Sequence, residues 1–222
     1  MITMQRQPEP ELMDVPEEAV AYAAADFSDV NAAFVDQLMT LTFNLGTARA
    51  IDLGTGPADI AIRVAQRRPG WHIDAVDAAQ AMIDIAQGAV AGASVAQQVR
   101  LHCVDAKQTG LAAGYDVIFS NSLLHHMPDP IRLWREIRRL ARTGTIIFVR
   151  DLLRPTTYDR VEEIVAQYAG SESATLQEEF RRSLLSAFSA SEIRDQLNAA
   201  GLPDLEIRQS SDRHVDIAGV VV

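Results

Sequence analysis

Short apolar runs alternate with amphipathic segments through the middle of the chain, and this alternation predicts the fold. Runs of strand length occupy residues 50–53, 73–76, 99–104, 115–120 and 145–149. Apolar positions with helical spacing occupy residues 58–68, 79–90 and 131–142. Continuous apolar strands separated by helices are typical of a parallel sheet that is buried on both faces. The pattern therefore predicts an α/β fold built on a doubly wound sheet.

The segments on either side of this alternation are helical in pattern. Residues 14–43 predict two helices, and residues 158–169 and 174–185 predict two more, separated by Gly170. Residues 1–11 form a short run rich in acids and prolines, which we expect to be frayed.

The C-terminal part has clear start and stop signals. Ser189 and Glu192 form an S-x-x-E capping box at the start of a helix, and Gly201 ends that helix. "LEIRQSS" and "HVDIAGVVV" then predict two strands that turn near residues 211–212. The prediction is a seven-stranded, mostly parallel sheet closed by a C-terminal β-hairpin.

We expect one domain, because 222 residues is an ordinary length for a single α/β domain. Its predicted parts are an N-terminal helical lid (1–45), a ligand-binding core (48–153), inserted helices (154–188) and a C-terminal helix with the closing strands (189–222). The lid and the inserted helices are expected to cover the strand ends, which a minimal sheet leaves open to water. Tyr22 and Phe27 are the predicted apolar contacts of the lid, with Tyr22 against the substrate, although both also suit an ordinary core.

The charge of the chain argues against one class of partner. The formal net charge is −10 at pH 7, and affinity for nucleic acid depends on Lys and Arg replacing counterions on the phosphates. One stretch, "RLWREIRRLAR" at 132–142, is basic. Its apolar positions have helical spacing, so we interpret the arginines as the outer face of a packed helix. Nucleic acid is not an expected partner.

No feature of the sequence indicates export or a membrane span. The N-terminal residues lack a basic and then apolar signal pattern, and no apolar run approaches the roughly 18 residues of a membrane helix. The single cysteine, Cys103, lies in an apolar run, which predicts a buried and inert thiol. We expect a cytoplasmic protein that is a monomer or a homodimer.

The stretch "IDLGTGPAD" after the first predicted strand indicates a ligand site. Gly54 and Gly56 permit a sharp turn and let a ligand approach the main chain, and doubly wound sheets bind ligands at the carboxyl ends of their strands. The dinucleotide fingerprint requires a third small residue, but Asp59 stands in that place. Asp52 would repel a pyrophosphate and attract an amine. The site is therefore predicted to take a ligand that is not a phosphate.

Two further acids end the second and third strands. Asp77 lies 21 residues after Gly56, which suits hydrogen bonds to the two hydroxyls of a ribose; the alternative is a helix N-cap. Asp105 suits the exocyclic amine of a base. Met82 could pack on the face of that base or belong to the core. Three acids at adjacent strand ends would together recognise an amine, a ribose and an adenine.

Four motifs in this order resemble those of the class I S-adenosylmethionine-dependent methyltransferases. They are "IDLGTG", "VDAAQAMIDIA", "VDAKQ" and "YDVIFSNSLLHHMPDP", within residues 48–153. The C-terminal stretch "FSASEIRDQLNAAGL" is similar to the family's as well. One departure is Ala58, where many members have a third glycine; we expect alanine to be small enough for binding to survive.

The resemblance implies S-adenosylmethionine as cofactor and S-adenosylhomocysteine as product. Within that pattern Asp52 and the glycine turn hold the methionyl end, Asp77 the ribose and Asp105 with Ala106 the adenine, while the Asn121 main chain contacts the amino-acid moiety. The cofactor-binding residues predicted in this way are Asp52, Gly54, Thr55, Gly56, Asp77, Ala78, Met82, Asp105, Ala106 and Asn121.

The methyl acceptor is predicted to be a small molecule. The fourth strand is followed by "NSLL" rather than the double proline of nucleic-acid amino-methyltransferases, and no Asp-Asn pair of a magnesium site follows the fifth strand. His125 and His126 are candidate catalytic bases, because imidazole titrates near neutrality; a structural or binding role is the alternative. Two adjacent histidines cannot easily point at one atom, and no third metal ligand is evident, so transfer is predicted to need no metal.

Arg150, at the end of the fifth strand, is a candidate clamp for an acidic acceptor; the alternative is a salt bridge to Asp151 or another acid. Two other functions stay open. One is a protein that binds S-adenosylmethionine without transferring the methyl group, and the other is a protein methyltransferase.

Overall fold

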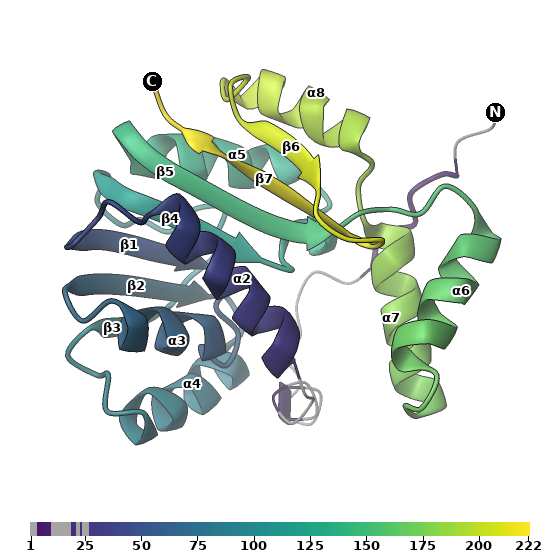
Figure 1. Ribbon diagram of the computed structural model, residues 1–222, viewed down its shortest axis with the longest axis horizontal. Helices are drawn as coiled ribbons and strands as arrows, with labels where there is room; N and C mark the ends of the chain where they lie inside the picture. The colour runs from purple at the N-terminus through teal and green to yellow at the C-terminus, as the bar shows by residue number, and fades with distance from the viewer. Residues whose placement is uncertain (1–3, 10–18, 21–22, 24–26) are drawn as a thin grey trace.

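One sheet of seven strands organises the molecule, and its strand order is β3-β2-β1-β4-β5-β7-β6 (Figure 1). The computed structural model describes residues 4–9, 19–20, 23 and 27–222. The strands are β1 (Ala48–Leu53), β2 (Trp71–Asp77), β3 (Val99–Cys103), β4 (Tyr115–Asn121), β5 (Ala141–Leu152), β6 (Glu206–Gln209) and β7 (His214–Val220). The first five are parallel, and β7 runs antiparallel between β5 and β6. The predicted α/β class and closing hairpin are confirmed.

Helices cover both faces of the sheet. The described helices are α2 (Ser28–Leu41), α3 (Asp59–Arg67), α4 (Gln80–Gly92), η1 (Leu124–His126, a 3-10 turn), α5 (Pro130–Leu140), α6 (Tyr158–Ala169), α7 (Ala174–Ser186) and α8 (Ala190–Ala200). Apolar side chains of α2, α3 and α4 share one core cluster with the strands, and those of α5 and α8 share a second cluster on the other face. The sheet is therefore buried on both sides, which explains its continuous apolar strands.

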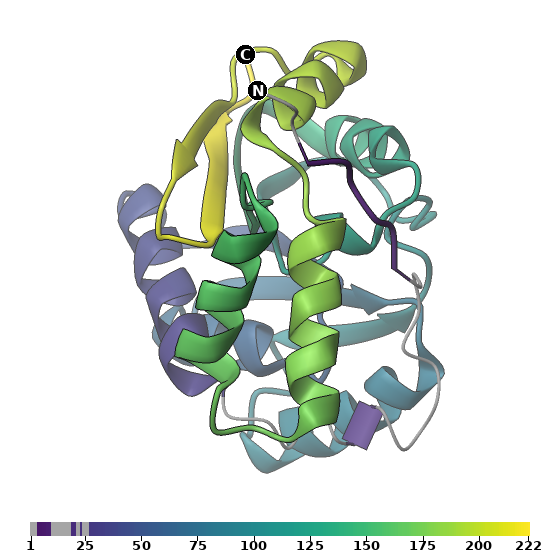
Figure 2. The same cartoon turned by 90° about the vertical axis from the view of Figure 1, so that its right-hand side faces the viewer.

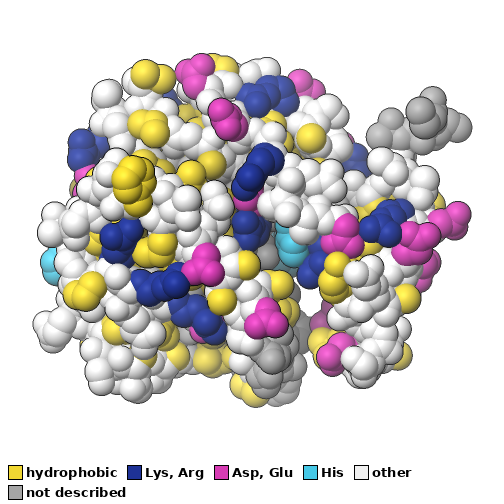
Figure 3. Space-filling model, in the orientation of Figure 1, with side chains coloured by type: hydrophobic (Ala, Val, Ile, Leu, Met, Phe, Trp, Pro, Cys, Tyr) yellow, Lys and Arg dark blue, Asp and Glu magenta, His cyan; other side chains and the backbone are white. Residues whose placement is uncertain are grey.

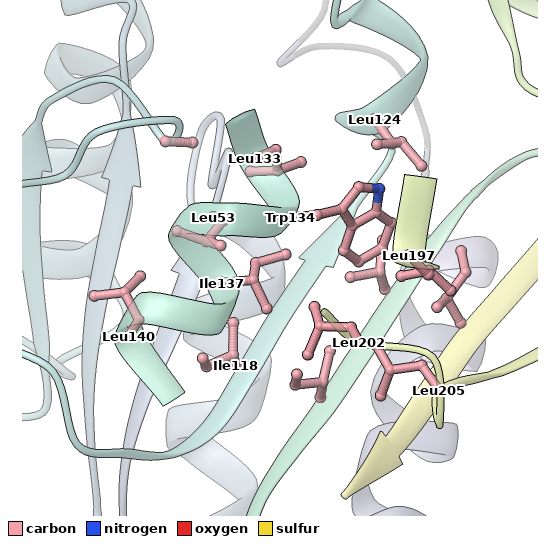
Figure 4. Close-up of a cluster of buried hydrophobic side chains, with 14 of the residues drawn as sticks. Leu53, Ile118, Leu124, Leu133, Trp134, Ile137, Leu140, Leu197, Leu202 and Leu205 are labelled. Carbon is pink, nitrogen blue, oxygen red and sulfur yellow. The ribbon is translucent and has the colours of Figure 1, made fainter. Parts of the chain in front are cut away.

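The arginine-rich helix packs as its pattern predicts. Leu133, Trp134 and Ile137 of α5 are fully buried against the sheet and α8 (Figure 4). The indole N–H of Trp134 donates to Gln196 Oε1 at 3.0 Å, so even the polar atom of this large side chain is satisfied inside the core. The capping box at Ser189 and Glu192 is present, and Gly201 ends α8 in the left-handed conformation (φ 74°).

The inserted helices α6 and α7 lie side by side beyond the end of β5 (Figures 1 and 2). They share a separate apolar cluster with Leu152 of β5 and with Met4. Residues 4–9 cross this region: Met4 is buried, and the Gln7 N–H donates to the Leu185 carbonyl at 3.0 Å. The expectation of a frayed N-terminus is therefore wrong for residues 4–9, because this segment has its own buried contacts.

The structure also bears on the expected burial of Cys103 and on the two helices expected in residues 14–43. Cys103 is exposed rather than buried, because it ends β3, which lies at the edge of the sheet and has only β2 beside it. The second predicted helix of residues 14–43 is present as α2, whereas most of the first lies outside the described residues. No helix of the described part has the length and apolarity to cross a lipid bilayer.

Candidate functional site

A cleft of about 440 Å³ opens at the carboxyl ends of the central strands. It lies where the strand order reverses between β1 and β4, which is where ligands bind in doubly wound sheets. All ten residues predicted to bind the cofactor line it. The structure thus brings together four separate stretches of sequence, from the ends of β1, β2, β3 and β4.

The loop after β1 forms the floor of this cleft. The N–H groups of Gly54 and Thr55 both donate to the Val76 carbonyl at 2.9 Å, which ties the loop to β2. Gly54 has φ 75°, a conformation that favours glycine, and a Cβ there would lie 2.8 Å from the end of the Leu123 side chain, which would have to shift. Ala58, where many members of the resembling family have glycine, also has a positive φ of 67°. A strained alanine at this point explains why glycine suits the position.

Asp52 presents a buried carboxylate to the cleft. Its side chain accepts a hydrogen bond from the Thr55 hydroxyl at 2.8 Å, and the residue is 2% exposed. Burial raises the pKa of Asp52 to about 7, against the lowering effect of the Thr55 hydrogen bond. A carboxylate held in this way gains strongly from a cationic partner.

Asp77 is oriented by the main chain on both sides. Its Oδ2 accepts from the Gly56 N–H at 2.8 Å and its Oδ1 from the Ala79 N–H at 2.9 Å. Helix α4 begins at Gln80 and has Ala79 as its N-cap, so Asp77 is not the N-cap residue. The carboxylate therefore joins the glycine loop to the start of α4 while it faces the cleft.

The adenine end of the predicted site comes from β3 and α4. Asp105 accepts from the Lys107 N–H at 2.8 Å, forms an ion pair with the Lys107 ammonium at 3.1 Å and has a side chain that is 43% exposed. Met82 lines the cleft and also packs against Ala19 and Ala79. Met82 therefore belongs both to the cleft wall and to a small apolar cluster, and its contact with a base stays a prediction.

The two adjacent histidines, His125 and His126, lie in different environments. His126 lines the cleft, whereas His125 is buried behind it. His125 Nδ1 lies 2.6 Å from Asp151 Oδ1, and the second Asp151 oxygen accepts from the Leu124 N–H at 2.6 Å. Although burial opposes it, the charges of Asp151 and Glu9 raise the pKa of His125, and His125 in turn lowers the pKa of buried Asp151. His125 therefore occupies a supporting position.

Glu9 completes a cluster with the two histidines. Its Oε1 lies 3.1 Å from His126 Nδ1 and 3.5 Å from His125 Nε2. The premise that adjacent histidines do not point at one atom is thus wrong here, because the 3-10 turn η1 places both rings beside the same oxygen. Burial raises the pKa of Glu9, against the effect of His125. The three ligand-type atoms lie within 4.8 Å of one another.

The sequence predicted two residues, Arg150 and Tyr22, to contact the substrate. The guanidinium of Arg150 binds both oxygens of Asp216 on β7, at 2.6 and 2.9 Å, and Arg150 does not line the cleft. The ion-pair alternative is confirmed, with Asp216 rather than Asp151 as partner. Tyr22 lies outside the described residues, and Phe27 lines the cleft.

Comparison with known proteins agrees with this geometry. Residues 51–147 match the family described as a methyltransferase domain. A structure described as a putative S-adenosyl-L-methionine-dependent methyltransferase from Methanococcus maripaludis superposes with a TM-score of 0.75 and 18% identity, covering 97% of this chain and 98% of that one. The chain therefore has the fold of the class I S-adenosylmethionine-dependent methyltransferases, and residues 51–147 match a methyltransferase domain.

Curated methyltransferases match about half of this chain. It is 28% identical over 124 residues to trans-aconitate 2-methyltransferase of Deinococcus radiodurans, covering 56% of this chain and 45% of the relative. It is 28% identical over 128 residues to ubiquinone biosynthesis O-methyltransferase of Xanthomonas oryzae pv. oryzae, covering 56% and 52%. The chain thus spans about half the length of the curated relatives that it matches.

Two residues of this site escaped the sequence interpretation. Glu9 lies far from the histidines along the chain, in a segment expected to be frayed, and no local pattern could have indicated it. For Asp151 the sequence did offer a signal. Neighbouring residues of a strand such as β5 point to opposite faces of the sheet, so the side chains of Arg150 and Asp151 are not expected to pair with each other. Asp151 therefore holds His125, whereas Arg150 faces β7.

Proposed function

We propose that this chain transfers a methyl group from S-adenosylmethionine to a small-molecule acceptor by in-line displacement and releases S-adenosylhomocysteine. The observation that carries the proposal is the convergence of Asp52, Asp77 and Asp105 on one cleft. These acids end or follow β1, β2 and β3, and each has a chemistry that suits one part of the cofactor.

The proposed assignment follows the environment of each acid. Asp52 is buried, so its carboxylate is the partner for the ammonium of the methionyl group. Asp77 is fixed by two main-chain N–H groups, which leaves an oriented carboxylate for the ribose hydroxyls. Asp105 is partly exposed at the far end and accepts from the adenine amine. Met82 and Ala106 line the cleft beside the base.

The acceptor is proposed to bind at the part of the cleft lined by His126 and Met127. The curated relatives include O-methyltransferases of small molecules, which favours an oxygen acceptor. A hydroxyl acceptor must lose its proton during transfer, and the cluster of Glu9, His125 and His126 is the polar group beside this part of the cleft. Displacement from a sulfonium depends mainly on positioning the two reactants.

Two features support a small molecule over a nucleic acid. The net charge is −10, and on the face shown in Figure 3 basic side chains lie next to acidic ones rather than in an unbroken basic patch. A protein that binds the cofactor without transferring the methyl group would have the same three acids, so binding alone does not establish catalysis.

Calorimetry tests the first half of the proposal. S-adenosylmethionine and S-adenosylhomocysteine should both bind with one site per chain, and NAD should not compete. Tight binding of NAD with no binding of S-adenosylhomocysteine would refute the assignment of the cleft.

A further inference from the structure

We propose that Glu9, His125 and His126 form a binding site for one divalent transition-metal ion of the zinc class, at the acceptor end of the cleft. The site goes beyond the proposed methyl transfer. Its two histidines belong to the fourth methyltransferase motif, whereas Glu9 lies outside all four motifs. Its three members come from the N-terminal segment and from the turn η1 after β4.

The spacing of the donor atoms suits a single ion. Glu9 Oε1 lies 3.1 Å from His126 Nδ1 and 3.5 Å from His125 Nε2, and all three atoms lie within 4.8 Å of one another. Ligands at about 2.0–2.2 Å from a tetrahedral zinc lie roughly 3.3–3.6 Å apart. Two of the three separations are therefore already close to those of neighbouring ligands on one ion.

The groups that hold His125 and Glu9 in place resemble those that hold the ligands in established metal sites. A ligand histidine usually gives its other ring N–H to a carboxylate, and His125 Nδ1 lies 2.6 Å from Asp151 Oδ1. This contact directs the Nε2 lone pair of a neutral His125 toward Glu9. The ligand carboxylate is held as well, because the Ser186 and Ser183 hydroxyls donate to the two Glu9 oxygens at 3.0 and 3.3 Å.

The chemistry of the donor set selects the class of ion. Two imidazoles and one carboxylate suit zinc, iron(II) or cobalt(II), whereas magnesium and calcium prefer an all-oxygen set. Glu9 Oε1 and the two ring nitrogens converge in a place of low exposure, where either protons or one divalent ion can lie between them. The positive charge of Arg6 acts on this cluster from nearby, while its Nη2 donates to the carbonyls of His125 and Met127.

A bound ion would have two consequences for this chain. It would fasten residues 4–9 to the core beside the cleft, because Glu9 would become a ligand. It would also place a Lewis acid next to the acceptor end, where His126 already lines the cleft. The sequence-based expectation of metal-free transfer assumed that no third ligand accompanies the histidines, and Glu9 is such a ligand.

The test measures metal uptake by the full chain without using turnover. After removal of metals, wild type and the variants Glu9→Gln and His126→Gln are titrated with Zn²⁺, and with Co²⁺ to record its visible absorption bands. Glu179→Gln and His72→Gln are matched controls, because both residues are exposed and lie outside the cluster. Mg²⁺ serves as the ion that the donor set should reject.

We expect one Zn²⁺ per wild-type chain, at least tenfold weaker binding in both cluster variants, and wild-type binding in both controls. Asp151→Asn should weaken binding by about 10–100-fold if it folds, since partners of ligand histidines have effects of this size. The proposed metal site would be refuted if wild type took up no stoichiometric Zn²⁺, or if wild type and Glu9→Gln took up equal amounts. The cluster of Glu9, His125 and His126 would then be held together by protons alone. Binding of S-adenosylmethionine, measured in parallel, separates this failure from failure of the proposed function.

Discussion

Asp52→Asn should stabilise the cofactor-free protein while it removes cofactor binding. Asp52 is 2% exposed, and burial raises its pKa from 3.8 to about 7. An acid whose pKa is raised on folding favours the folded state below pH 4, and this contribution is lost as the pH rises through about 7. Asparagine has the same shape and keeps an oxygen for the Thr55 hydroxyl, but it never becomes charged.

The size of the effect follows from the pKa change. A shift of about 3 pH units corresponds to about 4 kcal/mol, at about 1.4 kcal/mol per unit. At pH 5.5 only about 2 kcal/mol of this cost is present, because titration of the folded acid is incomplete. The stability advantage of Asp52→Asn should therefore grow by about 2 kcal/mol between pH 5.5 and pH 8.

Urea unfolding of both proteins at these two pH values measures the difference, with exposed Asp204 changed to Asn as the control. Calorimetry at pH 8 then compares their affinity for S-adenosylmethionine. Equal destabilisation of Asp52→Asn at both pH values would refute the buried-charge argument. Unchanged cofactor affinity would refute the ammonium assignment.

Two further substitutions test the remaining assignments. Asp77→Ala should weaken S-adenosylmethionine binding by about 2–4 kcal/mol in calorimetry, because charge-assisted hydrogen bonds to the ribose are lost; unchanged affinity would contradict the ribose role. Arg150→Met should lower the free energy of unfolding by about 3 kcal/mol, because Asp216 loses its bidentate partner at a site where the Asp216 side chain is 4% exposed. The KM for the acceptor should stay the same, and a raised KM without loss of stability would restore Arg150 as a substrate clamp.

The cofactor side of the site could be predicted from sequence because of a local rule. In parallel strands the carboxyl ends meet at one edge of the sheet, so Asp52, Asp77 and Asp105 are brought together once the strands are recognised. The glycine turn is a local signal as well, since φ 75° at Gly54 is a conformation that glycine adopts without strain.

The acceptor side depends on contacts that no local pattern encodes. Glu9 reaches the histidines through the fold of residues 4–9 against α7, which only tertiary packing determines. The exposure of Cys103 depends on β3 being the edge strand rather than on the apolar residues around it. The partner of Arg150 depends on β7 returning antiparallel beside β5, which places Asp216 directly opposite Arg150 in the register.

Transfer of a labelled methyl group tests the central claim most directly. The protein is incubated with methyl-labelled S-adenosylmethionine and a metabolite extract, and the products are separated by mass spectrometry. The account predicts S-adenosylhomocysteine and a labelled small molecule in equal amounts, both absent with Asp52→Asn. Cofactor binding with no product would instead indicate a binding protein without transferase activity, and label confined to protein or nucleic acid would contradict the proposed acceptor class.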